Sequence, residues 1–200
     1  MKFEHLSKSF DGKVILDDFC LELPARGTVV LMGPSGCGKT TLMRILAGLE
    51  TPDRGHIIHE KQRLSMVFQE DRLLGGVTAL GNILAVLDRH DEPLAMSWLK
   101  RMGIDDACHL LPHELSGGMR RRLAIARAMA YQGDLMLLDE PFAGLDDTTR
   151  EQIYPHLFDP KQTNRLTILI THDHTEAQRF ANHLITTNGP PLRVVKNITR

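Results

Sequence analysis

Residues 28–40 read TVVLMGPSGCGKT, a short apolar run that leads into a glycine-rich loop. The apolar run, residues 28–32, has the length and continuity of a β-strand buried on both faces. Residues 41–47 are predicted as a helix that Gly48 ends. The loop between them fits the pattern G-x-x-x-x-G-K-[ST], which is specific for phosphate when a strand precedes it and a helix follows it. This stretch therefore predicts an α/β protein that binds a phosphorylated ligand.

The loop supplies both backbone and side-chain groups to that ligand. Its glycines let the backbone approach closely, so that N–H groups and the helix N-terminus face the phosphates. We expect Lys39 to neutralise the β- and γ-phosphates of ATP and the Thr40 hydroxyl to ligate Mg²⁺. Cys37 is interpreted as a small space-filling residue, with a redox role as the alternative. The predicted nucleotide-binding residues of this stretch are Gly33, Pro34, Ser35, Gly36, Cys37, Gly38, Lys39, Thr40 and Thr41.

A second apolar run, residues 135–138, ends in the two carboxylates Asp139 and Glu140. In α/β sheets, ligands bind at the carboxyl ends of buried strands. Asp139 is therefore expected to bind Mg²⁺, directly or through water, and Glu140 to act as the general base that polarises the attacking water. Two acids after a strand also fit a solvated edge. The phosphate loop in the same chain favours the functional interpretation.

The composition is that of a soluble globular chain, with 42% hydrophobic and 24% charged residues. A formal charge of −1 argues against general nucleic-acid binding. No apolar run approaches the roughly 20 residues of a membrane helix, and the N-terminus lacks the apolar stretch of a signal peptide. The three scattered cysteines, Cys20, Cys37 and Cys108, fit reduced thiols in a cytoplasm.

The pattern along the chain predicts one domain, residues 1–200, with a helical subdomain inserted between core strands at residues 75–131. Thr148 with Glu151 and Asp173 with Glu176 are expected to form capping boxes at the starts of two helices. The expected helices span residues 79–87, 93–102 and 116–130. The other expected strands span residues 3–10, 14–23, 56–58, 64–68 and 166–170.

Residues 115–119 read LSGGM, at the start of the helix predicted to run to Ala130. A serine and two bare backbone amides at a helix N-terminus form an anion site, although a capped helix start with flexible glycines has the same pattern. Together with the phosphate loop and Asp139-Glu140, this pentapeptide makes the chain resemble the ATPase subunit of the ABC transporter family over essentially its full length. The resemblance implies that Ser116, Gly117 and Gly118 contact the γ-phosphate of ATP bound to the opposite subunit.

The same resemblance assigns four further residues. Gln69 matches the glutamine that ligates Mg²⁺ and senses the transmembrane partner, and His172 matches the switch histidine at the γ-phosphate. Asp146 matches an aspartate at the dimer interface, with a helix cap as the alternative. Phe10 lies where relatives place an aromatic residue on the adenine, with a core position as the alternative. The chain departs from the family at Met119 and Arg121, where relatives often carry glutamine, and the segment after His172 looks shorter than usual.

The resemblance implies an α/β P-loop NTPase core of the ABC ATPase type, with an N-terminal antiparallel β region and an inserted helical lobe. The expected function is the ATP-hydrolysing motor of a membrane transporter, and residues 67–74 are similar to taurine, sulfonate, nitrate and thiamine importers. The expected partners are a second, identical ATPase subunit, transmembrane permease subunits that contact Leu73 and Leu74, and a substrate-binding protein, but no nucleic acid. The expected location is peripheral, on the cytoplasmic face of the inner membrane.

Two other functions fit parts of the pattern. A soluble ABC-type ATPase that acts on nucleic acid or ribosomes would normally carry two cassettes or long basic inserts, and the sequence contains neither. A nucleotide sensor without turnover would need neither Glu140 nor His172. The sequence therefore favours the transporter motor.

Overall fold

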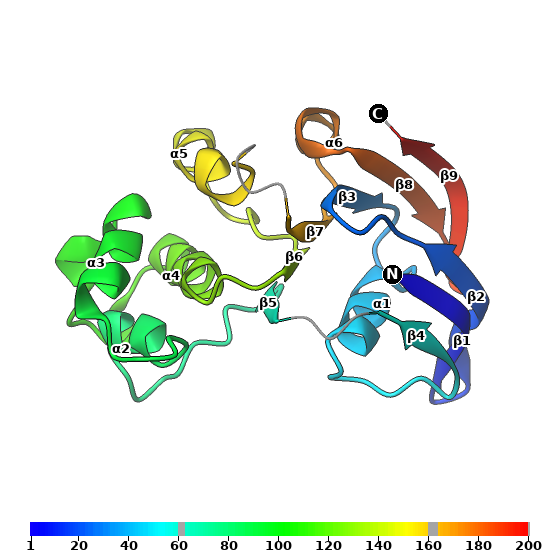
Figure 1. The fold of residues 1–200 in the computed structure, drawn as a ribbon, viewed down its shortest axis with the longest axis horizontal. Coiled ribbons are helices and arrows are strands. Elements are labelled where there is room, and N and C mark those ends of the chain that lie inside the picture. Colours follow the sequence, from blue (N-terminus) through cyan, green and yellow to red (C-terminus); the bar gives the residue numbers. More distant parts are fainter. Residues whose placement is uncertain (60–62, 160–163, 200) are drawn as a thin grey trace. The chain divides into compact units, whose positions relative to one another are not determined.

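The computed structural model describes residues 1–59, 63–159 and 164–199 (Figure 1). The chain divides into two compact units, and each is described by itself. The first unit contains the described residues of Met1–Met66, Asp134–Glu140 and Thr163–Arg200. The second contains those of Val67–Gly133 and Pro141–Gln162.

The first unit contains two β-sheets. The smaller is antiparallel, with strand order β2-β1-β4, and the larger has six strands in the order β5-β6-β7-β3-β8-β9. In the larger sheet β6, β7, β3 and β8 run parallel, and β9 is antiparallel to β8. The strands are β1 (Lys2–Phe10), β2 (Lys13–Glu22), β3 (Gly27–Met32), β4 (Arg54–Ile58), β5 (Leu64–Val67), β6 (Leu135–Asp139), β7 (Leu166–Ile170), β8 (His183–Asn188) and β9 (Arg193–Thr199).

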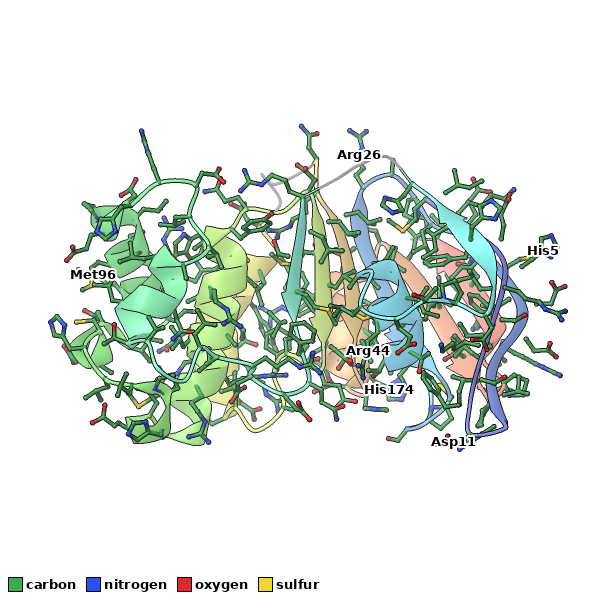
Figure 2. All side chains as sticks on the ribbon, turned by 90° about the horizontal axis from the view of Figure 1, so that it is seen from below. His5, Asp11, Arg26, Arg44, Met96 and His174 are labelled. Carbon is green, nitrogen blue, oxygen red and sulfur yellow. The ribbon has the colours of Figure 1, made fainter. Side chains whose placement is uncertain are left out.

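The predicted strands of the phosphate-loop core are confirmed, because their continuous apolar runs are buried on both faces. Strands β6 and β7 are buried at every position. The turn between β1 and β2 is formed by Asp11 and Gly12, both with positive φ, as a two-residue hairpin requires. Asp11 and His5 point outward from this antiparallel sheet (Figure 2). The α/β class with an antiparallel N-terminal sheet is therefore confirmed.

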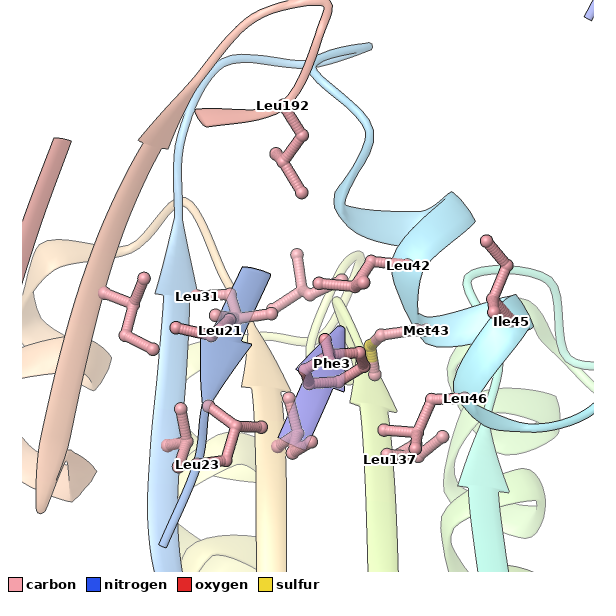
Figure 3. Packing of buried hydrophobic residues seen from close by; sticks show 14 of the residues in the cluster. Phe3, Leu21, Leu23, Leu31, Leu42, Met43, Ile45, Leu46, Leu137 and Leu192 are labelled. Carbon is pink, nitrogen blue, oxygen red and sulfur yellow. The ribbon is translucent and has the colours of Figure 1, made fainter. Parts of the chain in front are cut away.

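The helix that follows the phosphate loop, α1 (Lys39–Leu46), packs on the core of the first unit. Its residues Leu42, Met43 and Leu46 face a cluster that includes Phe3 and Leu137 (Figure 3). Burying each of these large side chains contributes about 1.5–3 kcal/mol. This packing fixes the axis of α1, and with it the position of the loop that precedes α1. The second helix of this unit is α6 (His174–Phe180).

The second unit is helical. It contains α2 (Ala79–Leu84), α3 (Glu92–Arg101), α4 (Gly117–Ala130) and α5 (Asp147–Leu157). Helix α4 contacts both α2 and α3, and its Leu123, Ile125 and Met129 are almost completely buried. This unit is larger than the predicted insertion, because it begins at Val67 and includes a second stretch after Pro141. The boundaries 75–131 stay a prediction.

Three local expectations differ from the structure. The helix after the phosphate loop begins at Lys39 rather than at residue 41, and the helix expected at residues 79–87 ends at Leu84 and continues as turns. The prediction that Thr148 and Glu151 form a capping box is wrong. Asp146 is the N-cap of α5, because its carboxylate accepts hydrogen bonds from the Thr149 backbone N–H at 2.9 Å and hydroxyl at 2.7 Å. Among the described residues, no helix is both long enough and apolar enough to cross a membrane.

Candidate active site

The phosphate loop leaves β3 and folds around the ammonium group of Lys39. This group donates hydrogen bonds to the carbonyls of Gly33 at 2.8 Å and Pro34 at 2.9 Å. The wrapping depends on Gly36 and Gly38, whose φ values of 75° and 115° suit glycine alone among common residues. Gly38 is also the N-cap of α1 and provides no side-chain cap, so the first N–H groups of the helix face the loop. The loop therefore offers a cation and a helix N-terminus to an anion.

The other loop residues are either exposed or packed below the loop. Pro34, Ser35 and Thr40 are exposed, and Thr41 is half-buried. Cys37 is fully buried in the core cluster, with its Sγ 3.5 Å from the Thr187 hydroxyl and 3.6 Å from the Lys39 ammonium. A buried thiol in this position fills space under the loop.

The carboxyl ends of β6 and β7 bring Glu140 and His172 together. These strands are parallel neighbours, with Asp139 opposite Ile170. The two side chains that follow them meet, with Glu140 Oε1 2.8 Å from His172 Nε2. Glu140 has a φ of 48°, in the left-handed region, which costs about 1–3 kcal/mol for a residue other than glycine and is typical of functional sites.

The segment that carries His172 is held by hydrogen bonds among Thr171, Asp173 and Glu176, of which the sequence predicted only the last two, as a capping box. The buried Glu176 accepts a hydrogen bond from the Thr171 hydroxyl, and this hydroxyl accepts one from the Asp173 N–H at 3.0 Å. Asp173 caps α6, as predicted, by accepting from the Thr175 and Glu176 N–H groups at 2.7 and 3.3 Å. Thr171 and Glu176 therefore hold the turn on which His172 lies. The Asp173–Glu176 spacing was the only sign of this in the sequence.

The donor groups of the first unit fit Mg²⁺. The Thr40 hydroxyl and the Asp139 carboxylate are hard oxygen donors of the kind this ion prefers. Asp139 is 1% exposed at the end of β6. Within the described part of the chain, no three His, Cys, Asp or Glu side chains form a ready metal cluster. Mg²⁺ is usually bound through one or two carboxylates together with phosphate oxygens of the substrate, and Thr40 and Asp139 are the residues that would hold it here.

Ser116, Gly117 and Gly118 lie at the start of α4 in the second unit. Ser116 is the predicted N-cap, and its Oγ accepts a hydrogen bond from the Met119 N–H at 3.2 Å. A Cβ built on Gly117 would lie 3.9 Å from its nearest neighbour, and one on Gly118 would lie 3.8 Å away. Both are ordinary contacts, so the described residues around them leave room for a Cβ at either position.

The three remaining predicted site residues, Gln69, Asp146 and Phe10, are exposed. Gln69 is exposed just after β5. Asp146 caps α5, and the hydrogen bond from the Thr149 hydroxyl lowers the pKa of its carboxyl group. Phe10, at the end of β1, is 42% exposed, with the Lys8 ammonium 4.9 Å from its ring centre. The core alternative for Phe10 is therefore wrong, and its role at the adenine stays a prediction.

A loop folded around Lys39 between β3 and α1, with Asp139, Glu140 and His172 at the carboxyl ends of β6 and β7, defines a P-loop nucleoside triphosphatase. A family model described as ABC transporter matches residues 16–143. The chain therefore belongs to the ABC transporter family, and it is an ATPase.

The chain is similar to import proteins of this family. It is 39% identical to the taurine import ATP-binding protein TauB of Pseudomonas aeruginosa (strain UCBPP-PA14), over 98% of this chain and 81% of that protein. It is 40% identical to the aliphatic sulfonates import ATP-binding protein SsuB 1 of Nocardia farcinica (strain IFM 10152), over 90% of this chain and 74% of that protein. Its fold matches the dimeric structure of the bacterial ABC transporter cassette MJ0796, with a TM-score of 0.85 and 26% identity over 99% of this chain and 97% of the other.

Proposed function

We propose that this chain is the ATP-hydrolysing motor of a bacterial importer of small molecules, and that two copies of it enclose ATP and Mg²⁺ between them. It is proposed to work on the cytoplasmic face of the inner membrane, bound to permease subunits that receive cargo from a substrate-binding protein. The observation that carries the proposal is the 2.8 Å contact between Glu140 and His172 at the strand ends of the phosphate-loop sheet.

Each of the five site residues in the first unit has a proposed role in hydrolysis. Lys39 neutralises the β- and γ-phosphates, while Thr40 and Asp139 would hold Mg²⁺, which would supply further positive charge. Glu140 takes the proton of the attacking water, a role generally worth about 10²–10⁴ in rate. His172 holds the Glu140 carboxylate and donates to the γ-phosphate. Phosphoryl transfer to water needs this positioning and charge neutralisation more than covalent chemistry.

The open surroundings of Gly117 and Gly118 support a site that is completed by a second copy. Glycine is needed where another molecule approaches the backbone closely, and among residues 1–59, 63–159 and 164–199 the nearest atoms to a Cβ at these positions lie 3.9 and 3.8 Å away. In the proposed dimer, Ser116 and these two glycines bind the γ-phosphate of the partner's ATP, and Asp146 lies at the interface. MJ0796, which matches this fold, has a dimeric structure.

Import is supported by the relatives, whose names describe taurine and aliphatic sulfonate import. The proposed contact with the permease lies at Leu73 and Leu74, beyond Gln69. Leu74 is 45% exposed, and the nearby Val77 is 36% exposed. These exposed apolar side chains close to Gln69 are available for contact with a partner chain. ATP-dependent export by the chain reconstituted with its permease would overturn the direction proposed here.

The proposal is tested by Glu140→Gln, using sizing chromatography with Mg-ATP and steady-state phosphate release. We expect phosphate release to fall about 10²–10⁴-fold and the variant to elute as a dimer, because uncleaved ATP keeps the two copies together. Glu22→Gln, on an exposed carboxylate at the end of β2, is the matched control and should behave like wild type. Wild-type hydrolysis by Glu140→Gln would refute the catalytic assignment. A monomer without turnover would refute a dimer that closes without the permease.

A further inference from the structure

Two arginines of α4 bind the backbone of residues 68–74, which we call the coupling segment. This segment contains Gln69, Leu73 and Leu74, and it belongs to the same unit as α4. Arginines in the sequence LSGGMRRRLAIAR would be expected on a solvated helix face. Instead, Arg121 and Arg127 each donate to main-chain carbonyls of the coupling segment.

Arg121 connects the start of the coupling segment to two other parts of the unit. Its side chain is 4% exposed. Nη1 donates to the carbonyls of Phe68 at 2.6 Å and Gln69 at 3.1 Å, and lies 3.5 Å from the Asp71 carboxylate. Nε donates to the carbonyl of Pro141 at 2.8 Å, which directly follows Glu140 in the chain. One guanidinium thus fixes the backbone at Gln69 and at the residue after the proposed general base.

Arg127, six residues further along α4, holds the middle of the coupling segment. Its Nη2 donates to the carbonyls of Arg72 at 2.9 Å and Asp71 at 3.5 Å. Its Nη1 donates to Oδ1 of Asn82 at 3.3 Å. Asn82 is fully buried and holds Leu74 through both backbone groups, accepting from its N–H at 2.8 Å and donating to its carbonyl at 3.1 Å.

The geometry makes the coupling segment and α4 a single mechanical element. Guanidinium groups donate in a fixed planar arrangement, and hydrogen bonds from a charged donor are shorter and stronger than neutral ones. The arginine bonds reach carbonyls in the first five residues of the segment, and Asn82 of α2, itself bonded by Arg127, holds Leu74. The backbone of the segment is therefore tied to α4 directly and through Asn82. The first residues of α4 are Gly117 and Gly118, which the proposed function places at the partner's ATP.

We propose that Arg121 and Arg127 are positioning residues that make Gln69 and residues 116–118 change position together when the permease moves Leu73 and Leu74. This inference rests on the proposed function for the roles of Gln69 and residues 116–118. Neither arginine touches the nucleotide in this proposal. They act through the backbone of the coupling segment, and Arg121 also acts through Pro141.

Arg122 provides a matched comparison on the same helix. Its Nη1 donates to the carbonyls of Met102 at 2.8 Å and Gly103 at 2.9 Å, at the end of α3. It therefore makes the same kind of bond to a segment outside the coupling segment, and its Nε also donates to the carbonyl of Gly118 in its own helix at 3.4 Å. Arg122→Met should cost comparable stability without loosening residues 68–74.

The test uses the whole chain and compares Arg121→Met, Arg127→Met and Arg122→Met by amide hydrogen exchange and by the Mg²⁺ dependence of ATP hydrolysis. We expect exchange at residues 68–74 to rise about tenfold in the first two variants, and at residues 102–104 alone in the third. For Arg121→Met the half-saturating Mg²⁺ concentration should rise about tenfold, the lower end of what losing a support of a metal ligand costs. Arg121→Lys, which keeps the charge and part of the bonding, should recover part of both losses, and it replaces Arg121→Met should that variant not fold.

Unchanged exchange at residues 68–74 in both Arg121 and Arg127 variants would overturn the inference and leave the proposed ATPase function standing. A Mg²⁺ midpoint that shifts equally in Arg121→Met and Arg122→Met would also overturn it, because the effect would then be general loss of stability. Hydrolysis that does not depend on Glu140 would instead overturn the proposed function, and the exchange comparison would still decide whether the segment is held.

Discussion

Gly33→Ala is expected to damage the phosphate loop through a steric contact that can be worked out from the structure. A Cβ at Gly33 would lie 2.5 Å from the carbonyl oxygen of Thr187 and would also meet the Thr187 hydroxyl. The side chain could rotate away, but the carbonyl is part of β8, which is paired on both sides in the larger sheet. The carbonyl oxygen would have to retreat by about 0.9 Å to reach the 3.4 Å of ordinary contact.

This steric contact is expected to lower the stability of the fold and to displace the phosphate loop. Forcing an extra methyl group into a packed site costs about 1–3 kcal/mol. If the loop moves instead of β8, the Gly33 carbonyl that binds the Lys39 ammonium shifts as well. A displacement of about 1 Å in a positioning group can cost about 100-fold in rate. We therefore expect a melting temperature a few degrees lower and ATP hydrolysis about 100-fold slower.

The measurements are thermal melting, binding of a fluorescent ATP analogue and phosphate release, with two other glycines as controls. Gly36→Ala has open space but a φ of 75°, so it should cost about 1–2 kcal/mol through the backbone alone. Gly117→Ala has room and ordinary φ, so it should leave melting and ATP binding by the single chain unchanged. Removing the hydroxyl with Thr187→Ala should not rescue Gly33→Ala, because the carbonyl remains. Wild-type melting and nucleotide affinity in Gly33→Ala would refute this reasoning.

Two further predictions concern the second unit. Replacing Leu73 and Leu74 with serine should abolish ATP-driven uptake in the reconstituted transporter while basal phosphate release stays within about twofold of wild type; undiminished uptake would show that the permease docks elsewhere. Asp146→Asn should lower the melting temperature at pH 7, and the difference should shrink as the pH falls below the unfolded pKa of about 3.9. The lowered pKa of Asp146 in the folded chain gives stability that is present above the unfolded pKa and is lost as the pH falls through the lower folded value. A difference in melting temperature that does not change with pH would show that the charge of the cap contributes nothing.

Much of the phosphate-loop unit could be predicted because its signals are local. The strands ending at Met32, Asp139 and Ile170 are continuous apolar runs, and each is buried as such a run requires. The contact between the side chains of Glu140 and His172 could not be predicted from a local sequence pattern. It depends on β6 and β7 being parallel neighbours in register, which is a property of the sheet rather than of either segment.

The capping error at α5 has a similar cause. Thr148 and Glu151 have the spacing of a capping box, but Asp146 lies two residues earlier and is the stronger N-cap because its carboxylate accepts from two groups of Thr149. Once Asp146 starts the helix, Thr148 becomes an interior position of its first turn. The sequence contained both patterns, and the competition between them was decided by hydrogen-bond strength.

The arginines of α4 show most clearly what the sequence alone could not provide. Arg120, Arg121 and Arg122 are consecutive and chemically identical, yet they donate to three different main-chain segments: the Leu115 carbonyl, the coupling segment and the end of α3. Arg120 reaches the coupling segment only through the Asp71 carboxylate, at 3.7 Å. On a helix, successive residues point about 100° apart, so each faces a different neighbour. Which neighbour lies where is decided by packing between segments more than 50 positions apart, such as Arg121 and Phe68. A charged run that reads as solvated surface can therefore contain a buried residue that binds the backbone of Phe68 and Gln69, and burial distinguishes Arg121, which is 4% exposed, from Arg120, which is 40% exposed.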